Sequence, residues 1–385
     1  MTKISLVAGE ASGDMLGAAL MRALRGAEPD VNFAGVGGRD MTAAGLVSLF
    51  PLEDIAVMGL TPVLARLPLL KRRLDETVRG VLADPPDCLV LIDAPDFTHR
   101  VARRVRAANP DIPIVDYVCP SVWAWRPGRA RKMRAYVDRV LAILPFEPAA
   151  LAKLGGPVCD YVGHPLVERL DEFSRAEEDA EESRSLVVLP GSREAEVRRM
   201  TPLYGEVVAR LRRELPALEV VMPPTEALET QVKAETARWP VPPRLLRQSE
   251  KLAAFRRARA ALATSGVVTL ELALARTPMA VAYKVSAPES LLRPLVKLEN
   301  FALPNLILGR SAEDRAVPEF FQQEATPEAL AAALAKLLRG GAEREAQLAA
   351  FAALRGKMLE AGSSPSRRAA EIVLSCARGG EKSRG

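Results

Sequence analysis

Short apolar runs alternate with longer amphipathic stretches through the first half of the chain. The apolar runs occupy residues 4–8, 88–92, 112–117 and 140–144, and the stretches with helical periodicity occupy 15–25, 69–82 and 100–108. Uninterrupted apolar runs of this length are typical of strands that are buried on both faces of a parallel sheet. Their alternation with helices predicts an α/β fold, in which helices cover both faces of an open, doubly wound sheet.

The same alternation begins again in the second half. Apolar runs at 185–189, 218–222, 260–263 and 279–284 each predict a strand, and helices are predicted to begin near Glu194 and after Gly266. Residues 326–377 are rich in Ala and Leu at helical spacing and predict terminal helices. We therefore expect two domains, residues 1–168 and 183–345, followed by terminal helices and a frayed tail over 346–385.

The chain of 385 residues is long enough for two hydrophobic cores, and its net charge of +5 indicates only a mild preference for anionic partners. Local charge is more informative. Residues 126–134 contain Lys and Arg without any acid, whereas residues 171–182 form an acidic run. Charge runs are most often solvated surface, and we expect this of the acidic run, which lies near the domain boundary.

Metal and redox chemistry have little support in the composition. The two histidines, His99 and His164, are far apart, and none of the four cysteines belongs to a C-x-x-C pair, so we expect neither a metal ion nor a cofactor. The first residues contain no apolar segment of signal-peptide length, and no run of about 18 apolar residues predicts a transmembrane helix. A cytoplasmic protein is therefore expected.

Ligands of open α/β sheets bind at the carboxyl ends of strands, and two loops of the first half lie there. In the loop 9–14, GEASGD, Gly13 permits close approach of a ligand to the backbone, and Ser12 can contact a phosphate or cap the next helix. In the second loop, Asp93 ends an apolar run and Asp96 opens the next helix. A carboxylate at the position of Asp93 is a candidate catalytic base, and the alternative is an anchor that holds the loop by hydrogen bonds.

Two loops of the second half have the same position. Residues 189–193, LPGSR, place a serine and an arginine at a helix start, where amide groups and a guanidinium can bind a pyrophosphate. Residues 264–271 open a helix with Ser-Gly and continue to a glutamate, which can accept hydrogen bonds from a ribose diol. An exposed cap and an ordinary amphipathic helix are the alternatives. The residues concerned are Ser192, Arg193, Ser265, Gly266 and Glu271.

Eight segments, in order along the chain, together resemble the lipid-A-disaccharide synthases. They are VAGEASGD (7–14), IDAPDF (92–97), PSVWAWRPGR (120–129), LPFE (144–147), VGHP (162–165), LPGSR (189–193), SGVVTLE (265–271) and LPNLILGR (303–310). VAGEASGD and PSVWAWR are the most specific of these segments. The Ser-Gly-to-Glu segment occurs in many enzymes that use nucleotide sugars.

This resemblance implies the GT-B fold, in which two Rossmann-like domains face each other across a cleft and C-terminal helices pack back or are exchanged in a homodimer. It implies transfer of 2,3-diacylglucosamine from UDP-2,3-diacylglucosamine to 2,3-diacylglucosamine 1-phosphate. The products are a β-1,6-linked disaccharide 1-phosphate, in lipid A biosynthesis, and UDP. The resemblance also implies an inverting reaction without a metal ion, and peripheral association with the inner membrane.

The resemblance places the essential carboxylate of the family at Asp93, which we expect to act as the base. We expect Arg193 to stabilise the charge of the departing UDP and Glu10 to orient the acceptor. The residues expected to bind substrate and UDP are Ser12, Gly13, Ser192, Arg193, Ser265, Gly266, Thr269, Glu271 and Asn305. The third residue of the family's Ser-Gly-Thr is Val267 here, so a hydroxyl contact is either absent or supplied by Thr269.

Substrates with acyl chains imply contact with an anionic membrane surface. Residues 60–74 combine several leucines with Arg66, Lys71, Arg72 and Arg73, as an interfacial segment does. The stretch 291–298 is similar. A helix that packs on the protein core explains either pattern equally well.

Three other functions compete with this assignment. A UDP-N-acetylglucosamine epimerase of the same fold would release no disaccharide. A dinucleotide-dependent oxidoreductase requires G-x-G-x-x-G after the first strand, and the chain lacks it there. A nucleic-acid binder is supported by the basic run 126–134 alone, with only Trp123 and Trp125 interleaved, so no nucleic acid is expected as a partner.

Overall fold

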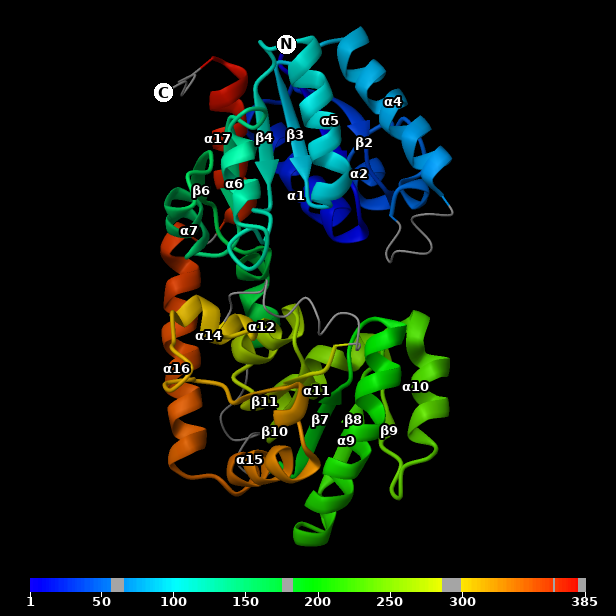
Figure 1. Cartoon of the computed structure of the whole chain (residues 1–385), viewed down its shortest axis with the longest axis vertical. Coiled ribbons are helices and arrows are strands. Elements are labelled where there is room, and N and C mark those ends of the chain that lie inside the picture. Colours follow the sequence, from blue (N-terminus) through cyan, green and yellow to red (C-terminus); the bar gives the residue numbers. More distant parts are fainter. Residues whose placement is uncertain (57–65, 175–182, 286–298, 363, 380–385) are drawn as a thin grey trace. The chain divides into compact units, whose positions relative to one another are not determined.

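A computed structural model describes residues 1–56, 66–174, 183–285, 299–362 and 364–379 (Figure 1). The chain forms two compact units. The first is Met1–Glu168 together with Met358–Gly385, and the second is Arg169–Lys357. The segment from residue 346 onward is therefore divided, because its residues up to Lys357 pack with the second unit and the last helix packs with the first.

The first unit is built on a parallel sheet, with six strands in the described part of the chain. The strands are β1 (Lys3–Ala8), β2 (Asn32–Val36), β3 (Cys88–Ile92), β4 (Ile114–Tyr117), β5 (Arg139–Ala142) and β6 (Val158–Tyr161). They lie in the order β2-β1-β3-β4-β5-β6. Val7 of β1 pairs with Val36 on one side and with Leu91 on the other, so β1 and β3 end level with each other.

Helices cover both faces of this sheet. They are α1 (Ala11–Ala27), α2 (Arg39–Ala43), α4 (Leu67–Ala83), α5 (Pro95–Ala108), α6 (Gly128–Met133), α7 (Glu147–Lys153) and α17 (Pro365–Ala377). Successive strand side chains point to opposite faces. Leu6 therefore packs in one core with α1 and α17, whereas Val7 packs in the other core with α4, α5 and α6. Figure 1 shows α4 and α5 lying over the same face.

The second unit repeats this architecture. Its strands are β7 (Ser185–Leu189), β8 (Glu219–Met222), β9 (Arg244–Leu245), β10 (Ala260–Thr264), β11 (Met279–Tyr283) and β12 (Glu319–Phe321), in the order β12-β11-β10-β7-β8-β9. Its helices are α9 (Glu194–Glu214), α10 (Glu229–Thr236), α11 (Lys251–Arg257), α12 (Val267–Leu274), α14 (Leu303–Leu308), α15 (Pro327–Arg339) and α16 (Ala342–Met358). On one face, Leu186 and Val188 pack with Tyr204 of α9 and Leu334 of α15.

Each sheet contains one point at which the strand order reverses. In the first unit the chain passes from β1 to β2 and then returns to place β3 on the other side of β1. In the second unit β8 and β9 lie on one side of β7, and β10 lies on the other. Loops that leave neighbouring strands in opposite directions open a crevice at the carboxyl ends of those strands. The four chemically distinctive loops of the sequence are the loops at these two points.

The eight strands predicted from apolar runs are confirmed, with ends that differ by at most two residues. Four strands were not predicted: β2, β6, β9 and β12. All four are sheet edges. An edge strand is covered by fewer neighbours, so it needs no continuous apolar run, and β2 and β6 are accordingly half-exposed along much of their length.

Three of the predicted segments fall wholly or partly outside the described residues. These are residues 60–65 of the leucine-rich segment, 175–182 of the acidic run and 291–298. The described part of the leucine-rich segment opens α4. Leu67 is 46% exposed there, whereas Leu74 is buried in the core and Arg73 forms ion pairs with Asp54 and Glu76.

Candidate active site

The loops after β1 and β3 touch each other at the reversal point of the first unit. A Cβ atom on Gly9 would lie 2.2 Å from the Cβ atom of Ala94, and a Cβ atom on Gly13 would lie 3.0 Å from the carbonyl oxygen of Ile92. Because no side chain fits at Gly9, glycine there lets the two loops close on each other. This contact brings Ser12 of one loop against Asp93 of the other.

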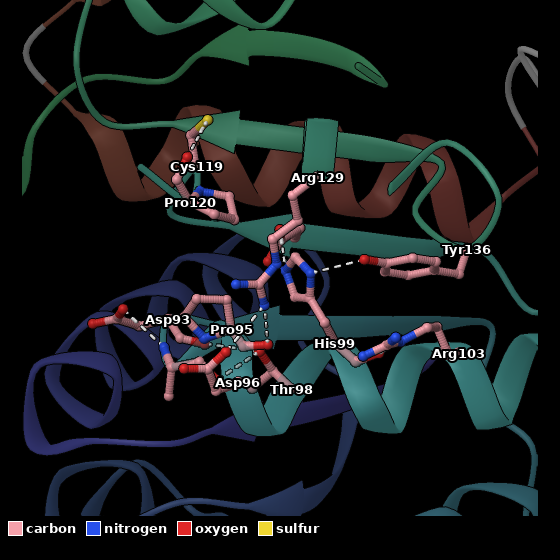
Figure 2. A network of polar contacts seen from close by, with 12 residues as sticks. Asp93, Pro95, Asp96, Thr98, His99, Arg103, Cys119, Pro120, Arg129 and Tyr136 are labelled. Carbon is pink, nitrogen blue, oxygen red and sulfur yellow. Dashed lines mark hydrogen bonds and ion pairs between the residues drawn. The ribbon is translucent and has the colours of Figure 1, made fainter. Parts of the chain in front are cut away.

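Asp93 has a left-handed backbone conformation with a φ of 57°, and Ala94 follows it at 44°. Each such non-glycine residue costs about 1–2 kcal/mol. The side chain of Asp93 stabilises the turn, because Oδ1 accepts a hydrogen bond from the Ala94 amide at 2.8 Å and Oδ2 accepts one from the Ser12 hydroxyl at 2.9 Å. Figure 2 shows this turn directly before α5. The result is an oriented, half-exposed carboxylate at the end of the strand.

The loop after β1, residues 9–14, contains two acids of its own, Glu10 and Asp14, and they have different positions. Glu10 is half-buried and is the residue before α1, and its carbonyl oxygen accepts a hydrogen bond from the Asp14 amide at 2.9 Å. The Asp14 carboxylate is buried and accepts hydrogen bonds from the amides of Gly38, Asp40 and Met41 at 2.7–3.0 Å. Asp14 therefore caps α2 rather than its own helix, whereas Ser12 of the same loop contacts Asp93.

A buried polar network holds α5 on the sheet. The imidazole of His99 places Nε2 2.9 Å from Oδ2 of Asp116 on β4, and Nδ1 3.1 Å from the Tyr136 hydroxyl. His99 and Asp116 are both essentially without solvent contact. Arg103 donates from Nε to the His99 carbonyl at 3.1 Å and lies over the Tyr136 ring (Figure 2). The sequence did not predict this network, because its members are separated along the chain and only the packing of α5 brings them together.

The segments PSVWAWR and LPFE meet in a second buried contact. Glu147 is 2% exposed, and its carboxylate accepts hydrogen bonds from the Trp123 indole at 3.2 Å and from the Leu144 amide at 3.0 Å. Burial raises the pKa of Glu147 to about 8. The Trp123 ring also packs edge-on against Phe146, so the tryptophan loop is held on both its polar and its apolar side.

A cavity of about 430 Å³ lies at the reversal point of the second unit, among the loops after β7, β8 and β10. Parallel strands that end side by side place their loops at one edge of the sheet, which is why loops far apart in sequence share this cavity. Five of the residues expected to bind UDP line it. They are Ser192, Arg193, Ser265, Gly266 and Glu271.

Glu196 organises the wall of this cavity that follows β7. Its Oε2 accepts a hydrogen bond from the Ser192 amide at 3.0 Å, and its Oε1 accepts one from Nη1 of Arg193 at 3.0 Å. A Cβ atom on Gly191, whose φ is +129°, would lie 2.5 Å from the Glu196 Cβ, so only glycine fits there. The Arg193 side chain stays 60% exposed and can turn toward an anion in the cavity.

Lys251 provides a cation that the sequence reasoning missed. Its Nζ lies 2.9 Å and 2.7 Å from the two carboxylate oxygens of Glu271, and both residues line the cavity. Lys251 begins α11, twenty residues before Glu271, and no motif marks it. The pair leaves the cavity with a neutralised carboxylate instead of a bare negative charge.

The hydroxyls near the Ser-Gly turn point into the protein. Ser265 donates to the Phe301 carbonyl at 2.7 Å, and Thr269, which is fully buried, donates to the Gly266 carbonyl at 2.8 Å. Val267 is 53% exposed and lines the cavity. The structure thus places Thr269 away from the cavity lining, in a position where its hydroxyl does not replace the one that is missing at Val267.

Asn305 also lies away from the cavity lining. Its amide nitrogen donates to the Val317 carbonyl at 2.8 Å and to Oε1 of Glu319 at 2.6 Å, and its oxygen accepts a hydrogen bond from the Val317 amide at 3.0 Å. The residue is fully buried. Its side chain joins α14 to the chain that leads into β12, which is a supporting role in this unit.

The sequence relationships decide the family. Residues 4–373 match the family described as lipid-A-disaccharide synthetase. The lipid-A-disaccharide synthase of Bradyrhizobium diazoefficiens is 49% identical, over 99% of this chain and 98% of that protein. The synthase of Nitrobacter hamburgensis is 50% identical, over 97% of this chain and 95% of that protein. The synthase of Rhodospirillum centenum is 44% identical, over 96% of this chain and 94% of that protein.

The chain belongs to the lipid-A-disaccharide synthase family.

Solved structures at low identity have the same fold. A glycotransferase of kitacinnamycin matches with a TM-score of 0.60 at 17% identity, over 97% of this chain and 98% of that one. MurG of Acinetobacter baumannii matches with a TM-score of 0.57 at 12% identity, over 97% of this chain and 100% of that one. A UDP-GlcNAc 2-epimerase of Neisseria meningitidis matches with a TM-score of 0.53 at 11% identity, over 80% of this chain and 90% of that one. These similarities show the GT-B fold, which transferases and epimerases share, whereas the family match selects the transferase.

The family match covers both units and the loops at both reversal points. All eight segments that suggested a lipid-A-disaccharide synthase lie within it. The loop pair around Asp93 and the cavity around Glu271 are therefore the two candidate parts of the active site of this family member.

Proposed function

We propose that this enzyme transfers 2,3-diacylglucosamine from its UDP derivative to the 6-hydroxyl of 2,3-diacylglucosamine 1-phosphate, giving the β-1,6-linked disaccharide 1-phosphate and UDP. The observation that carries the proposal is the family match over residues 4–373. The first unit is assigned the acceptor and the second unit the UDP-sugar. In support, each unit has one pair of chemically distinctive loops at its reversal point.

Asp93 is proposed as the base for the acceptor. As the acceptor oxygen attacks the anomeric carbon, its proton passes to the Asp93 carboxylate, the bond from that carbon to the UDP oxygen breaks, and UDP leaves with the electron pair. A single displacement of this kind inverts the α-linked donor into a β-linked product. The hydrogen bonds from Ser12 and Ala94, which orient the carboxylate, support this role. Glu10 and Gly13 are proposed to border the acceptor.

The cavity of the second unit is proposed to hold UDP. Glu271 accepts hydrogen bonds from the ribose diol, and Arg193 together with the amides that open α9 and α12 faces the diphosphate. These groups stabilise the negative charge that UDP gains as it leaves, without a metal ion. Ser192 and Ser265 border the same cavity, whereas Thr269 and Asn305 support it from behind.

Peripheral association with the anionic inner membrane, from the cytoplasmic side, is proposed because both substrates carry acyl chains. Among the described helices, none is both long and apolar enough to cross a membrane. The exposed start of α4 supports lipid contact, since Leu67 lies there beside Lys71 and Arg72. Arg73 is already paired with Asp54. A homodimer is proposed as well, and light scattering tests it.

Incubation of the protein with both lipid substrates tests the function. We expect one disaccharide 1-phosphate and one UDP for each donor consumed, at a rate that EDTA leaves unchanged. In the described part of the chain, no three His, Cys, Asp or Glu side chains gather as metal ligands. An epimerised UDP-sugar without disaccharide would refute the transferase. Activity that is lost in EDTA and restored by Mg²⁺ would refute the metal-free mechanism.

Lys251→Met is expected to weaken UDP binding about tenfold, which corresponds to about 1.4 kcal/mol. The substitution leaves the Glu271 carboxylate without its cation, so the cavity repels the diphosphate. Calorimetric titration with UDP measures the effect. Lys336→Met is the matched control, because Lys336 pairs with Glu343 in the same unit but outside this cavity. Equal affinities for the two variants would show that the Lys251–Glu271 pair has no part in binding.

A further inference from the structure

A basic groove lies on the first unit between α5 and the chain that enters and follows α6. Its volume is about 690 Å³. The cations that line it are Arg100, Arg103, Arg106, Arg126, Arg129 and Lys132, and the carboxylate that lines it is Asp96. None of these residues takes part in the transfer step proposed for Asp93 and Arg193.

The cations come from two segments that line the groove. Arg100, Arg103 and Arg106 recur every three residues on α5, a spacing that places their side chains on one face of the helix. On the other wall Arg126 precedes α6 with a left-handed φ of 56°, and Arg129 and Lys132 lie on α6 three residues apart. A groove with cations on both walls concentrates positive potential between them and attracts an anion.

Part of this charge is already used within the protein. Arg106 pairs with Asp138, and Arg129 pairs with Asp96 and donates to the Pro95 carbonyl at 3.0 Å. Within the described ranges, no carboxylate forms an ion pair with Arg100 or Arg126. Both are exposed, and Arg126 lies 3.9 Å above the Trp125 ring. These two guanidiniums are therefore available to a ligand.

One end of the groove, at Asp96, adjoins the first turn of α5. Figure 2 shows Arg129 reaching from the opposite wall to Pro95 and Asp96, in the first turn of α5 directly after the Asp93 turn. Arg100 follows Asp96 by four residues, which is a rise of about 6 Å along the helix. Asp96, Arg100 and Arg126 line the same groove, so a group held at Arg100 lies within about two helical turns of the turn that carries Asp93.

We propose that this end of the groove binds the phosphate of the acceptor, and this rests on the proposed function. In a glucosamine 1-phosphate, the reacting 6-hydroxyl and the phosphate are attached through C5 and C1, the two carbons that flank the ring oxygen, so one sugar ring joins the group that meets Asp93 to the group that meets the two guanidiniums. A phosphate monoester carries a charge of about −1.5 to −2 at pH 7 and three acceptor oxygens. Guanidiniums bind such a group with paired, charge-assisted hydrogen bonds.

A nucleic acid fits the groove less well. Binding of single strands uses aromatic faces on which bases stack. The groove offers none, since Arg126 covers the Trp125 ring and Tyr136 is 7% exposed. The lipid phosphate therefore explains the groove better than a polynucleotide does.

The test compares two double variants that lose the same charge from the same part of the fold. The groove variant is Arg100→Gln with Arg126→Gln, and the control is Arg104→Gln with Arg131→Gln, whose arginines do not line the groove. Equilibrium binding is measured in neutral detergent micelles with 2,3-diacylglucosamine 1-phosphate and with its phosphate-free analogue. The single variant Arg100→Gln accompanies them in case Arg126 is needed for folding, which thermal melting monitors.

We expect the groove variant to bind the phosphorylated acceptor at least about 30-fold more weakly than the control, as the loss of two charge-assisted contacts implies. Its affinity for the phosphate-free analogue and its KM for the donor should not change. Equal weakening for both acceptors, or none, overturns the proposal. So does a variant that loses binding only to phosphatidylglycerol vesicles, since the groove would then serve bulk lipid. If the phosphate effect appears in binding but wild-type protein makes no disaccharide, the site stands and the proposed reaction fails.

Discussion

Asp93→Asn is expected to slow glycosyl transfer by about 10²–10⁴-fold, the usual loss when a general base is removed. The substitution preserves the local geometry. Asparagine tolerates the left-handed φ of 57° at this position. The amide oxygen of the asparagine still accepts a hydrogen bond from the Ala94 amide. Its amide nitrogen donates to the Ser12 hydroxyl, so that hydroxyl becomes the acceptor of the bond instead of the donor. Only the ability to take a proton is lost, so the fall in kcat tests the base itself.

Asp96→Asn is the matched control for this prediction. The Asp96 side chain is 89% exposed and meets Arg129 at only 3.4 Å, so we expect its loss to change kcat by less than about threefold, in keeping with a weak surface ion pair. UDP affinity, measured by calorimetry, should match wild type for both variants. If Asp93→Asn stays within about tenfold of wild type, or if Asp96→Asn is the inactive variant, the carboxylate of Asp93 is a loop anchor and another group is the base.

Glu147→Gln is expected to remove a large pH dependence of stability. Burial raises the folded-state pKa of Glu147 from 4.5 to about 8. Between these values the folded protein keeps the proton and the unfolded chain has lost it. The stability of wild type therefore falls as pH rises through this window, with a limiting slope of about 1.4 kcal/mol per pH unit and a total of about 5 kcal/mol. Glutamine resembles the protonated form and does not titrate.

Chemical denaturation of both proteins at pH 5, 6.5 and 8, followed by tryptophan fluorescence, measures this effect. The free-energy difference between variant and wild type should grow in favour of the variant as pH rises. His164 contributes with the opposite sign, because burial lowers its pKa to about 4 and stability is lost as pH falls below 6.5. That contribution is common to both proteins and cancels in the difference. The exposed Glu226→Gln serves as control, and a variant whose curve runs parallel to wild type contradicts the prediction.

The central strands were predictable and the edges were not. A strand with neighbours on both sides and helices on both faces must be apolar throughout. The strands β1, β3, β7 and β10 can therefore be predicted from apolar runs in the sequence alone. The edge strand β9 needs only to pair along one side. Its two residues, Arg244–Leu245, form no apolar run that would predict a strand.

The loops with distinctive chemistry were predictable as well, but their partnerships were not. Gly9 and Asp93 are 84 residues apart along the chain, and only the placement of β3 beside β1 brings their loops into contact. The same holds for Ser192 and Ser265, which line one cavity because β10 lies beside β7. The sequence predicts which loops are chemically distinctive, and the strand order decides which of those loops share a site.

Side-chain direction was the least predictable feature. Thr269 and Asn305 belong to family segments and were expected to touch UDP, yet both are buried and bonded within the protein. Lys251 belongs to no such segment and lines the cavity. A motif records that a residue is required, whether it touches the substrate or supports those that do. Packing alone distinguishes the two cases.

By itself the sequence determined the fold class, the family and the identity of the chemically distinctive loops, because buried strands and ligand-binding turns each impose a local residue pattern. Tertiary structure alone decided that Asp93 sits in a strained turn beside Ser12, that Glu147 is buried with a raised pKa, and that Arg100 and Arg126 remain available for an anion. These properties depend on neighbours that are distant in the chain. Hydrogen bonding, burial and electrostatic potential act through space, so no local pattern encodes them.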